Sequence, residues 1–273
     1  MFSRRRPITT QPRPWSRGRL LLMLSGVGLI IVVLIVSLTT SVWLAIDDHG
    51  ERATRTSDGS AVSGDLPLRD RIAAAPMASV DPQAAFNPDP ATTGTGSIRV
   101  PAPTIVAGPA GVADGFPQTP EGAVGQLAAI EQRVLEAMSI PVTREVHDAW
   151  VRPGGPSFAE WGLTGNVTSF LTHAYQGGQE KDLTTLIAAA PAAGQVKGSD
   201  GPTWTLACVL LDVQAWIKTE SRMGYGFCSR MEWIEGRWQV AAGTAPATAP
   251  SAWPGSKAAV AAGWLTWTEG QVP

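Results

Sequence analysis

Asp212 is the residue of this sequence best suited to acid–base chemistry, because it lies in an otherwise apolar run from Trp204 to Ile217. A carboxyl group buried among apolar side chains has a raised pKa and can exchange protons with a substrate. The alternative is an ion pair with Arg230 or Arg222 on the open face of a sheet. We favour the ion pair, so Asp212 and Arg230 are candidate binding residues and no catalytic residue is expected.

The other residues that could support chemistry form no recognisable catalytic or metal-binding motif. His49, His147 and His173 are far apart, and none belongs to an HExxH or His-x-His pattern. No GxSxG elbow, P-loop or GxGxxG fingerprint is present. We therefore expect a non-enzymatic protein that uses no metal ion or cofactor.

Cys208 and Cys228 are the only cysteines. An even number of cysteines in an exported domain indicates a disulfide, whereas two buried free thiols are the alternative. The spacing is unlike that of a zinc site, since there is no CxxC pair and no neighbouring pair of histidines. We favour a disulfide between these two residues.

Two strand registers are compatible with these residues. A turn centred on Lys218 would place the two cysteines opposite each other, whereas a turn centred on Ser221 would place Asp212 opposite Arg230. The registers differ by an even number of residues, so both keep the same side chains on the same faces. Both stay open here, with a slight preference for the disulfide register.

Tryptophans near the C-terminus are further candidates for binding. Nine of the eleven tryptophans lie from Trp150 onward. Tryptophan is enriched in binding hot spots, but it also fills cores and fixes irregular segments. We favour the packing role and retain as candidate binding residues Trp253, Trp264 and Trp267.

The elements that must position these residues follow from periodicity and capping. Thr119, Pro120 and Glu121 give an N-cap, a proline at the first helical position and an acidic first turn. The expected helices are 120–140, 143–150, 166–175, 181–190 and a short one at 256–262. The expected strands are 204–217, 225–233 and 237–241.

Helices followed by a meander of antiparallel strands predict an α+β fold with the helices packed on one face of a curved sheet. In the run 204–217, every odd-numbered residue from Ala207 onward is apolar, whereas Cys208, Asp212 and Gln214 lie at even positions. We therefore expect the odd-numbered side chains to face the helices.

Residues 20–46 predict a transmembrane helix. These 27 residues contain no charge, and as a helix they would extend about 40 Å, enough for a hydrocarbon core of about 30 Å. A cleaved signal peptide is the alternative, but its apolar region is typically only about 7–15 residues long. Six arginines precede the run, which predicts a cytoplasmic N-terminus and an extracytoplasmic C-terminal part.

The charge distribution argues against nucleic acid as a partner. The whole chain has a formal charge of −2, and the basic tail 1–19 contributes six positive charges, so the remainder carries about −8. A short basic flank is what membrane orientation and anionic lipids already require. The expected partners are the membrane, proteins of the cell envelope and a second copy of the chain.

Residues 47–117 predict a disordered linker, in which 66–75 is the one place suited to a short helix. They contain nine prolines, eight glycines and few large apolar residues. Such a segment buries too little apolar surface to offset the entropy lost on ordering. The predicted exported domain is therefore 118–273.

Three short segments carry a resemblance to a group of proteins: 228–233 (CSRMEW), 236–238 (GRW) and 249–256 (APSAWPGS). They resemble uncharacterised actinomycete single-pass membrane proteins associated with plasmids and integrative conjugative elements. The layout of the whole chain also resembles the bitopic scaffold proteins of conjugation and type IV secretion machines. That resemblance implies a cystatin-like, nuclear-transport-factor-2-like cone domain that assembles partners and has no catalytic residues.

The expected function is therefore that of a non-enzymatic scaffold or accessory subunit anchored in the cell membrane. The alternative is a cone domain that binds or hydrolyses envelope material. That alternative requires a deep pocket between the helices and the sheet, with polar groups near Asp212.

Overall fold

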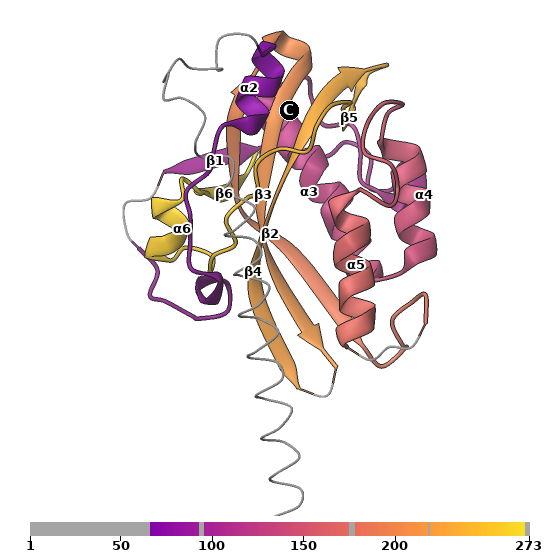
Figure 1. Cartoon of the computed structure of the whole chain (residues 1–273), viewed down its shortest axis with the longest axis vertical. Coiled ribbons are helices and arrows are strands. Elements are labelled where there is room, and N and C mark those ends of the chain that lie inside the picture. The colour runs from indigo at the N-terminus through magenta and orange to yellow at the C-terminus, as the bar shows by residue number, and fades with distance from the viewer. Residues whose placement is uncertain (1–65, 93–95, 175–177, 218, 271–273) are drawn as a thin grey trace, which may run out of the picture. The chain divides into compact units, whose positions relative to one another are not determined.

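A six-stranded sheet in the order β1-β6-β2-β3-β4-β5 organises the domain (Figure 1). The computed structural model describes residues 66–92, 96–174, 178–217 and 219–270. The strands are β1 (Ser97–Val100), β2 (Leu186–Ser199), β3 (Trp204–Trp216), β4 (Glu220–Ile234), β5 (Arg237–Val240) and β6 (Leu265–Glu269). Strands β2 to β5 form an antiparallel meander, whereas β1 and β6 pair in parallel and join the sheet through two residues of β2.

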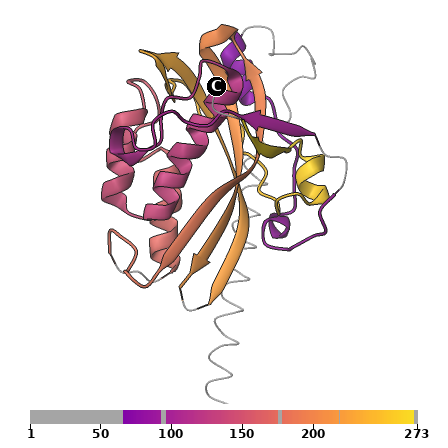
Figure 2. The same ribbon diagram turned by 180° about the vertical axis from the view of Figure 1, so that it is seen from behind.

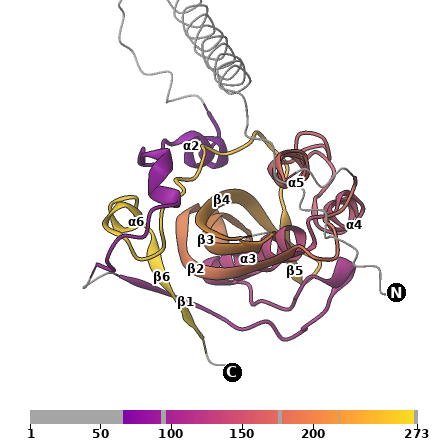
Figure 3. The ribbon, with the colours of Figure 1, turned by 90° about the horizontal axis from the view of Figure 1, so that it is seen from below.

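The helices lie on both sides of this sheet (Figures 1 and 3). The α-helices are α2 (Leu68–Ala74), α3 (Pro120–Ala137), α4 (Ile140–Trp150), α5 (Gly162–His173) and α6 (Lys257–Ala261). Short 3₁₀ turns are η2 (Pro82–Ala85), η3 (Pro109–Gly111) and η4 (Gly201–Thr203). The sheet is curved into a half-barrel, and the long β2 bends visibly in Figure 2, where two register shifts interrupt its pairing with β3.

The predicted α+β class is confirmed, and so is the face of the sheet that meets the helices. Ala207, Val209 and Leu211 share one core with buried residues of α3, α4 and α5. We call this side of the sheet the helix face. Capping explains where α3 begins, because the Thr119 hydroxyl accepts a hydrogen bond from the Gly122 N–H.

One predicted helix is wrong. Residues 181–190 contain no helix, and β2 begins at Leu186 within this segment. The alanines have high helix propensity, but pairing of Leu186–Pro191 with β3 outweighs that weak local preference.

The prediction of a disordered linker is wrong for its described part, 66–92 and 96–117. Residues 66–92, which we call the strap, cross the face opposite the helices and carry α2 and η2. Residues 97–100 form β1. The domain therefore includes residues well before the predicted boundary at 118. Residues 47–65 lie outside the described part of the chain.

The strap and the C-terminal tail, residues 242–264, cover the even-numbered side chains of β3 from Trp204 to Leu210. Cys208 and Leu210 pack with alanines of the tail, Trp264, and Met77 and Val80 of the strap. Backbone hydrogen bonds join strap to tail from Ala247 to Ala73 and from Trp253 to Ala84. The composition of the strap misled the prediction because much of the apolar surface buried here is contributed by β3 and the tail. We call this side the strap face.

The predicted transmembrane helix, 20–46, and the basic tail, 1–19, lie outside the described residues. Among the helices that the structure does describe, none has the length and apolar character needed to cross a bilayer.

Candidate functional site

The predicted disulfide is confirmed. Cys208 and Cys228 are directly opposite each other on β3 and β4, with a Cα–Cα distance of 4.0 Å, and their sulfurs are bonded. Trp216 pairs with Glu220, so the register is the one that a turn centred on residue 218 requires. The bond lies under the strap and tail and fixes the two strands of the hairpin to each other.

Asp212 forms an ion pair, and its partner is Arg222. The guanidinium donates from Nε to Oδ1 at 2.7 Å and from Nη2 to Oδ2 at 2.5 Å. This hydrogen bonding raises the pKa of Arg222. The ring of Trp253 lies against the same guanidinium, 4.8 Å from its central carbon. Asp212 is on the strap face, so it takes no part in a site between helices and sheet.

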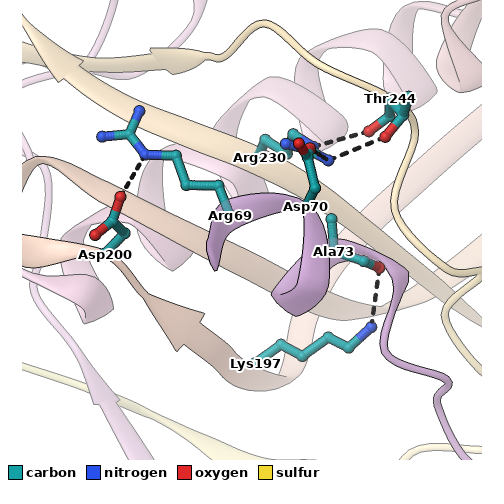
Figure 4. A network of polar contacts seen from close by, with 7 residues as sticks. All are labelled: Arg69, Asp70, Ala73, Lys197, Asp200, Arg230 and Thr244. Carbon is teal, nitrogen blue, oxygen red and sulfur yellow. Dashed lines mark hydrogen bonds and ion pairs between the residues drawn. The ribbon is translucent and has the colours of Figure 1, made fainter. Parts of the chain in front are cut away.

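The alternative pairing of Asp212 with Arg230 is wrong, because Arg230 binds the strap. Its Nη2 lies 2.6 Å from Asp70 Oδ1 in α2, and its Nε donates to the Thr244 carbonyl at 2.8 Å (Figure 4). The side chain of Arg230 is buried. A buried guanidinium requires such partners, so this contact ties strap, sheet and tail together at one point.

Further contacts beside Arg230 complete what we call the latch, which Figure 4 shows without Glu232. Arg69 Nε lies 2.7 Å from Asp200 Oδ2, and Arg69 Nη1 lies 3.1 Å from Glu232 Oε1. Lys197 donates to the carbonyl of Ala73 at 3.3 Å, at the C-terminal end of α2. The latch therefore holds both ends of α2 against the sheet.

The three candidate tryptophans have packing roles. Trp264 is buried and its Nε1 donates to the Pro250 carbonyl at 3.1 Å, so it is not a surface anchor. Trp253 is half-buried against Arg222, and Trp267 packs against the helix-face core from β6. Trp216, which sequence reasoning did not select, is the more exposed one at the end of β3.

An apolar opening in the described domain lies between α5, the end of α3 and the ends of β2, β3 and β4. It has a volume of about 620 Å³. Its apolar lining comes from helices and strands alike: Leu135, Met138, Phe170, Ile187, Val213 and Met223. The sequence carries one indication of this cavity. The apolar odd-numbered positions of β3 continue as far as Ile217, beyond the residues that α3 covers.

A polar pair lies at the inner part of this cavity. The Asn166 amide donates a hydrogen bond to the Tyr225 hydroxyl, and both residues line the cavity. Asn166 is two turns of α5 before His173, which lies at the open end. Burial raises the pKa of the Tyr225 phenol well above its usual range, and the charge of Glu131 raises it further.

Glu131 is the most unusual group near the cavity. It lies one helical turn before Leu135 on α3, it is fully buried, and neither carboxyl oxygen has a hydrogen-bond partner. Burial raises its pKa well above the usual range of a carboxyl group. Its spacing of four residues from Leu127 and from Leu135 places it on the apolar face of α3, which is the signal that sequence reasoning missed.

The arrangement is suited to non-covalent binding of an apolar molecule. The Nδ1 of His173 forms a hydrogen bond with the Ser169 carbonyl of the same helix, at 2.7 Å. In the described part of the chain, no group of three His, Cys, Asp or Glu residues is placed to hold a metal ion. No family model, curated protein or solved structure matches this chain.

Proposed function

We propose that this protein is a non-enzymatic scaffold or accessory subunit, anchored in the cell membrane by residues 20–46. Its extracytoplasmic domain assembles proteins of the envelope, such as those of a conjugation or secretion apparatus. The half-barrel sheet with α3, α4 and α5 packed on one face is the arrangement expected of a nuclear-transport-factor-2-like cone, which supports the proposal. The basic flank sets the N-terminus in the cytoplasm.

The latch is the observation that supports a scaffold most directly. A scaffold must hold its partners in a defined position relative to the membrane. In this domain the strap, which is its first described segment, is fixed in place. The ion pairs Asp70–Arg230 and Arg69–Asp200 and backbone hydrogen bonds to the tail hold it. Of the polar groups considered for chemistry, Arg230 belongs to the latch and Asp212 is paired with Arg222.

Crosslinking in the native membrane tests the scaffold. The full chain, carrying an affinity tag, is crosslinked in its own cells, purified, and its partners identified by mass spectrometry. The expected result is recovery of a second copy or of envelope proteins, with several-fold loss in Asp70→Ala. Arg71→Ala is the matched control, since Arg71 is an exposed neighbour in the same helix. Recovery of the chain alone, as a monomer, would refute the scaffold.

A second candidate, supported by the cavity, is that the domain binds an apolar ligand of the envelope. The volume of about 620 Å³ falls within the range of roughly 300–1,000 Å³ typical of ligand sites. The lining is mostly apolar with a few polar side chains, among them the hydrogen-bonded Asn166–Tyr225 pair and Arg222, as such sites commonly are. Because Asp212 lies on the other face, the cavity favours binding rather than hydrolysis.

A further inference from the structure

At the end of the sheet where the cavity opens, apolar side chains lie on both faces, and on the strap face Glu220 and Arg222 are paired with Trp216 and Gln214. Ile187 and Ala215 line the cavity on the helix face. Their neighbours Leu186 and Trp216 are paired across the strands and belong to the strap face, where they are 61% and 36% exposed. Leu183, just before β2, is fully exposed. We call Leu183, Leu186 and Trp216 the rim.

Exposed apolar side chains beside an open apolar cavity mark an interaction site. A protein partner docking on one face would leave the other face in water. An apolar medium that surrounds the sheet end would contact both faces. The turn beyond β3 carries Lys218 and Glu220 in its sequence, so this medium must also accept charge, as a lipid headgroup layer does.

The chemistry of the cavity also selects its occupant. A peptide segment would bring N–H and C=O groups, each of which needs a hydrogen-bond partner when it is buried. The lining offers few polar atoms, and the Asn166 and Tyr225 side chains already bond to each other. An acyl chain brings no polar group along its length and therefore fits the lining without cost.

The chain outside the described domain is long enough to bring the rim to a bilayer. The predicted membrane span ends at residue 46, and residues 47–65 can extend to about 65 Å. Figure 1 shows α2, next to which the strap begins, at the end of the domain opposite the β3–β4 turn. The 15 residues of β4 extend about 50 Å, so the connection exceeds the length of the sheet.

We propose that the cavity binds one acyl chain of a membrane lipid while the rim rests on the headgroup layer. This deepens the ligand-binding candidate and rests on the membrane anchor of the proposed function. The lipid enters between α5 and the ends of β2, β3 and β4, with its chain directed toward Tyr225.

Photolabelling tests this occupant. The full chain is reconstituted in vesicles of phosphatidylglycerol and phosphatidylethanolamine that contain a trace of phosphatidylcholine with a diazirine in one acyl chain. After illumination, labelled peptides are mapped by mass spectrometry. The expected labels lie at cavity residues, including Phe170 and Met223, as well as within 20–46.

Variants separate the cavity from its surroundings. Leu186→Asp places a charge on the rim at an exposed position and should reduce the cavity label at least fivefold. Val106→Asp is the matched control, because Val106 is 88% exposed in the loop between β1 and η3 and should change nothing. Ala215→Trp fills the cavity and should remove its label, provided that the disulfide and the intrinsic fluorescence show a folded domain.

Each outcome of these experiments supports or overturns the lipid occupant. Label confined to 20–46, or cavity label that Leu186→Asp and Ala215→Trp leave unchanged, would overturn the lipid occupant and leave the anchor and the scaffold intact. A protein crosslinked at Trp216 in native membranes without lipid label would assign this end of the sheet to a protein partner and overturn it equally. A chain that carries no label at 20–46 and does not sediment with vesicles would remove the anchor itself.

Discussion

Glu131 should make the domain less stable as the pH rises. Its ordinary pKa of 4.5 is raised well above that value in the folded domain by burial without a partner. Above pH 4.5 the unfolded chain releases this proton, whereas the folded domain keeps it. The folded state then binds more protons than the unfolded state, so stability falls until the pH exceeds the folded pKa.

The size of this effect follows from one proton. Each pH unit between the two pKa values lowers the free energy of unfolding by about 1.4 kcal/mol. Glu131→Gln keeps the shape of the side chain and removes the titration. Relative to this variant, the wild type should match it below pH 4.5 and lose about 1.4 kcal/mol per pH unit above it.

The assay is urea unfolding of the full chain in nanodiscs, followed by tryptophan fluorescence with the disulfide intact, at half-unit steps from pH 4 to pH 8. Glu136→Gln is the matched control, since Glu136 lies on the same helix with an exposed side chain. Wild type and Glu131→Gln curves that stay parallel across this range would refute the assignment of a buried, protonated carboxyl group.

Three further predictions concern the contacts that hold the strap and tail. Asp70→Ala should destabilise the domain by about 2 kcal/mol, less than the ~3–5 kcal/mol of a fully buried pair because Asp70 is partly exposed, and urea unfolding beside Arg71→Ala measures it. Reduction of the disulfide, which joins residues 20 apart, should lower stability by about 3 kcal/mol, and an unfolding midpoint unchanged by reductant would contradict this. Gly224→Ala should release the tail, because a Cβ there would collide with the Ala252 carbonyl, and proteolysis should then cut within 246–256. Gly165→Ala, in an open position of α5, should instead stabilise by up to about 1 kcal/mol, and equal protease resistance of the two alanine variants would argue against the close approach at Gly224.

Local patterns predicted those elements whose causes are local. The Thr119 cap, the parity of β3 and the opposed cysteines each depend on neighbours within one helix or one hairpin. Glu131 was missed because an acidic residue within an amphipathic helix is ordinarily assigned to its solvent side. The spacing of Glu131 from Leu127 and Leu135 instead places it on the apolar face, which the packing of α3 against the sheet closes.

The strap and the cavity depend on distant parts of the chain. Ala73 and Met77 are ordered because the even-numbered residues of β3, more than one hundred positions later, supply the apolar surface they cover. The strands β1 and β6 were missed for the same reason, since each is short and is completed by the other. The composition of a segment describes that segment alone. It therefore cannot show that apolar surface from a distant part of the chain will pack against it.

The bonds between strap and tail also set the order in which the domain is completed. Ala73 bonds with Ala247, Ala84 with Trp253, and Thr92 with Gly255, so the earliest residues of the domain close onto nearly the last. Contacts so distant in sequence form late in folding, because the intervening chain must first be ordered. A chain synthesised from its N-terminus therefore holds an unattached strap until residues 247–255 have been made. Among the described residues, the strap is the first part of the domain to be made and among the last to be fixed.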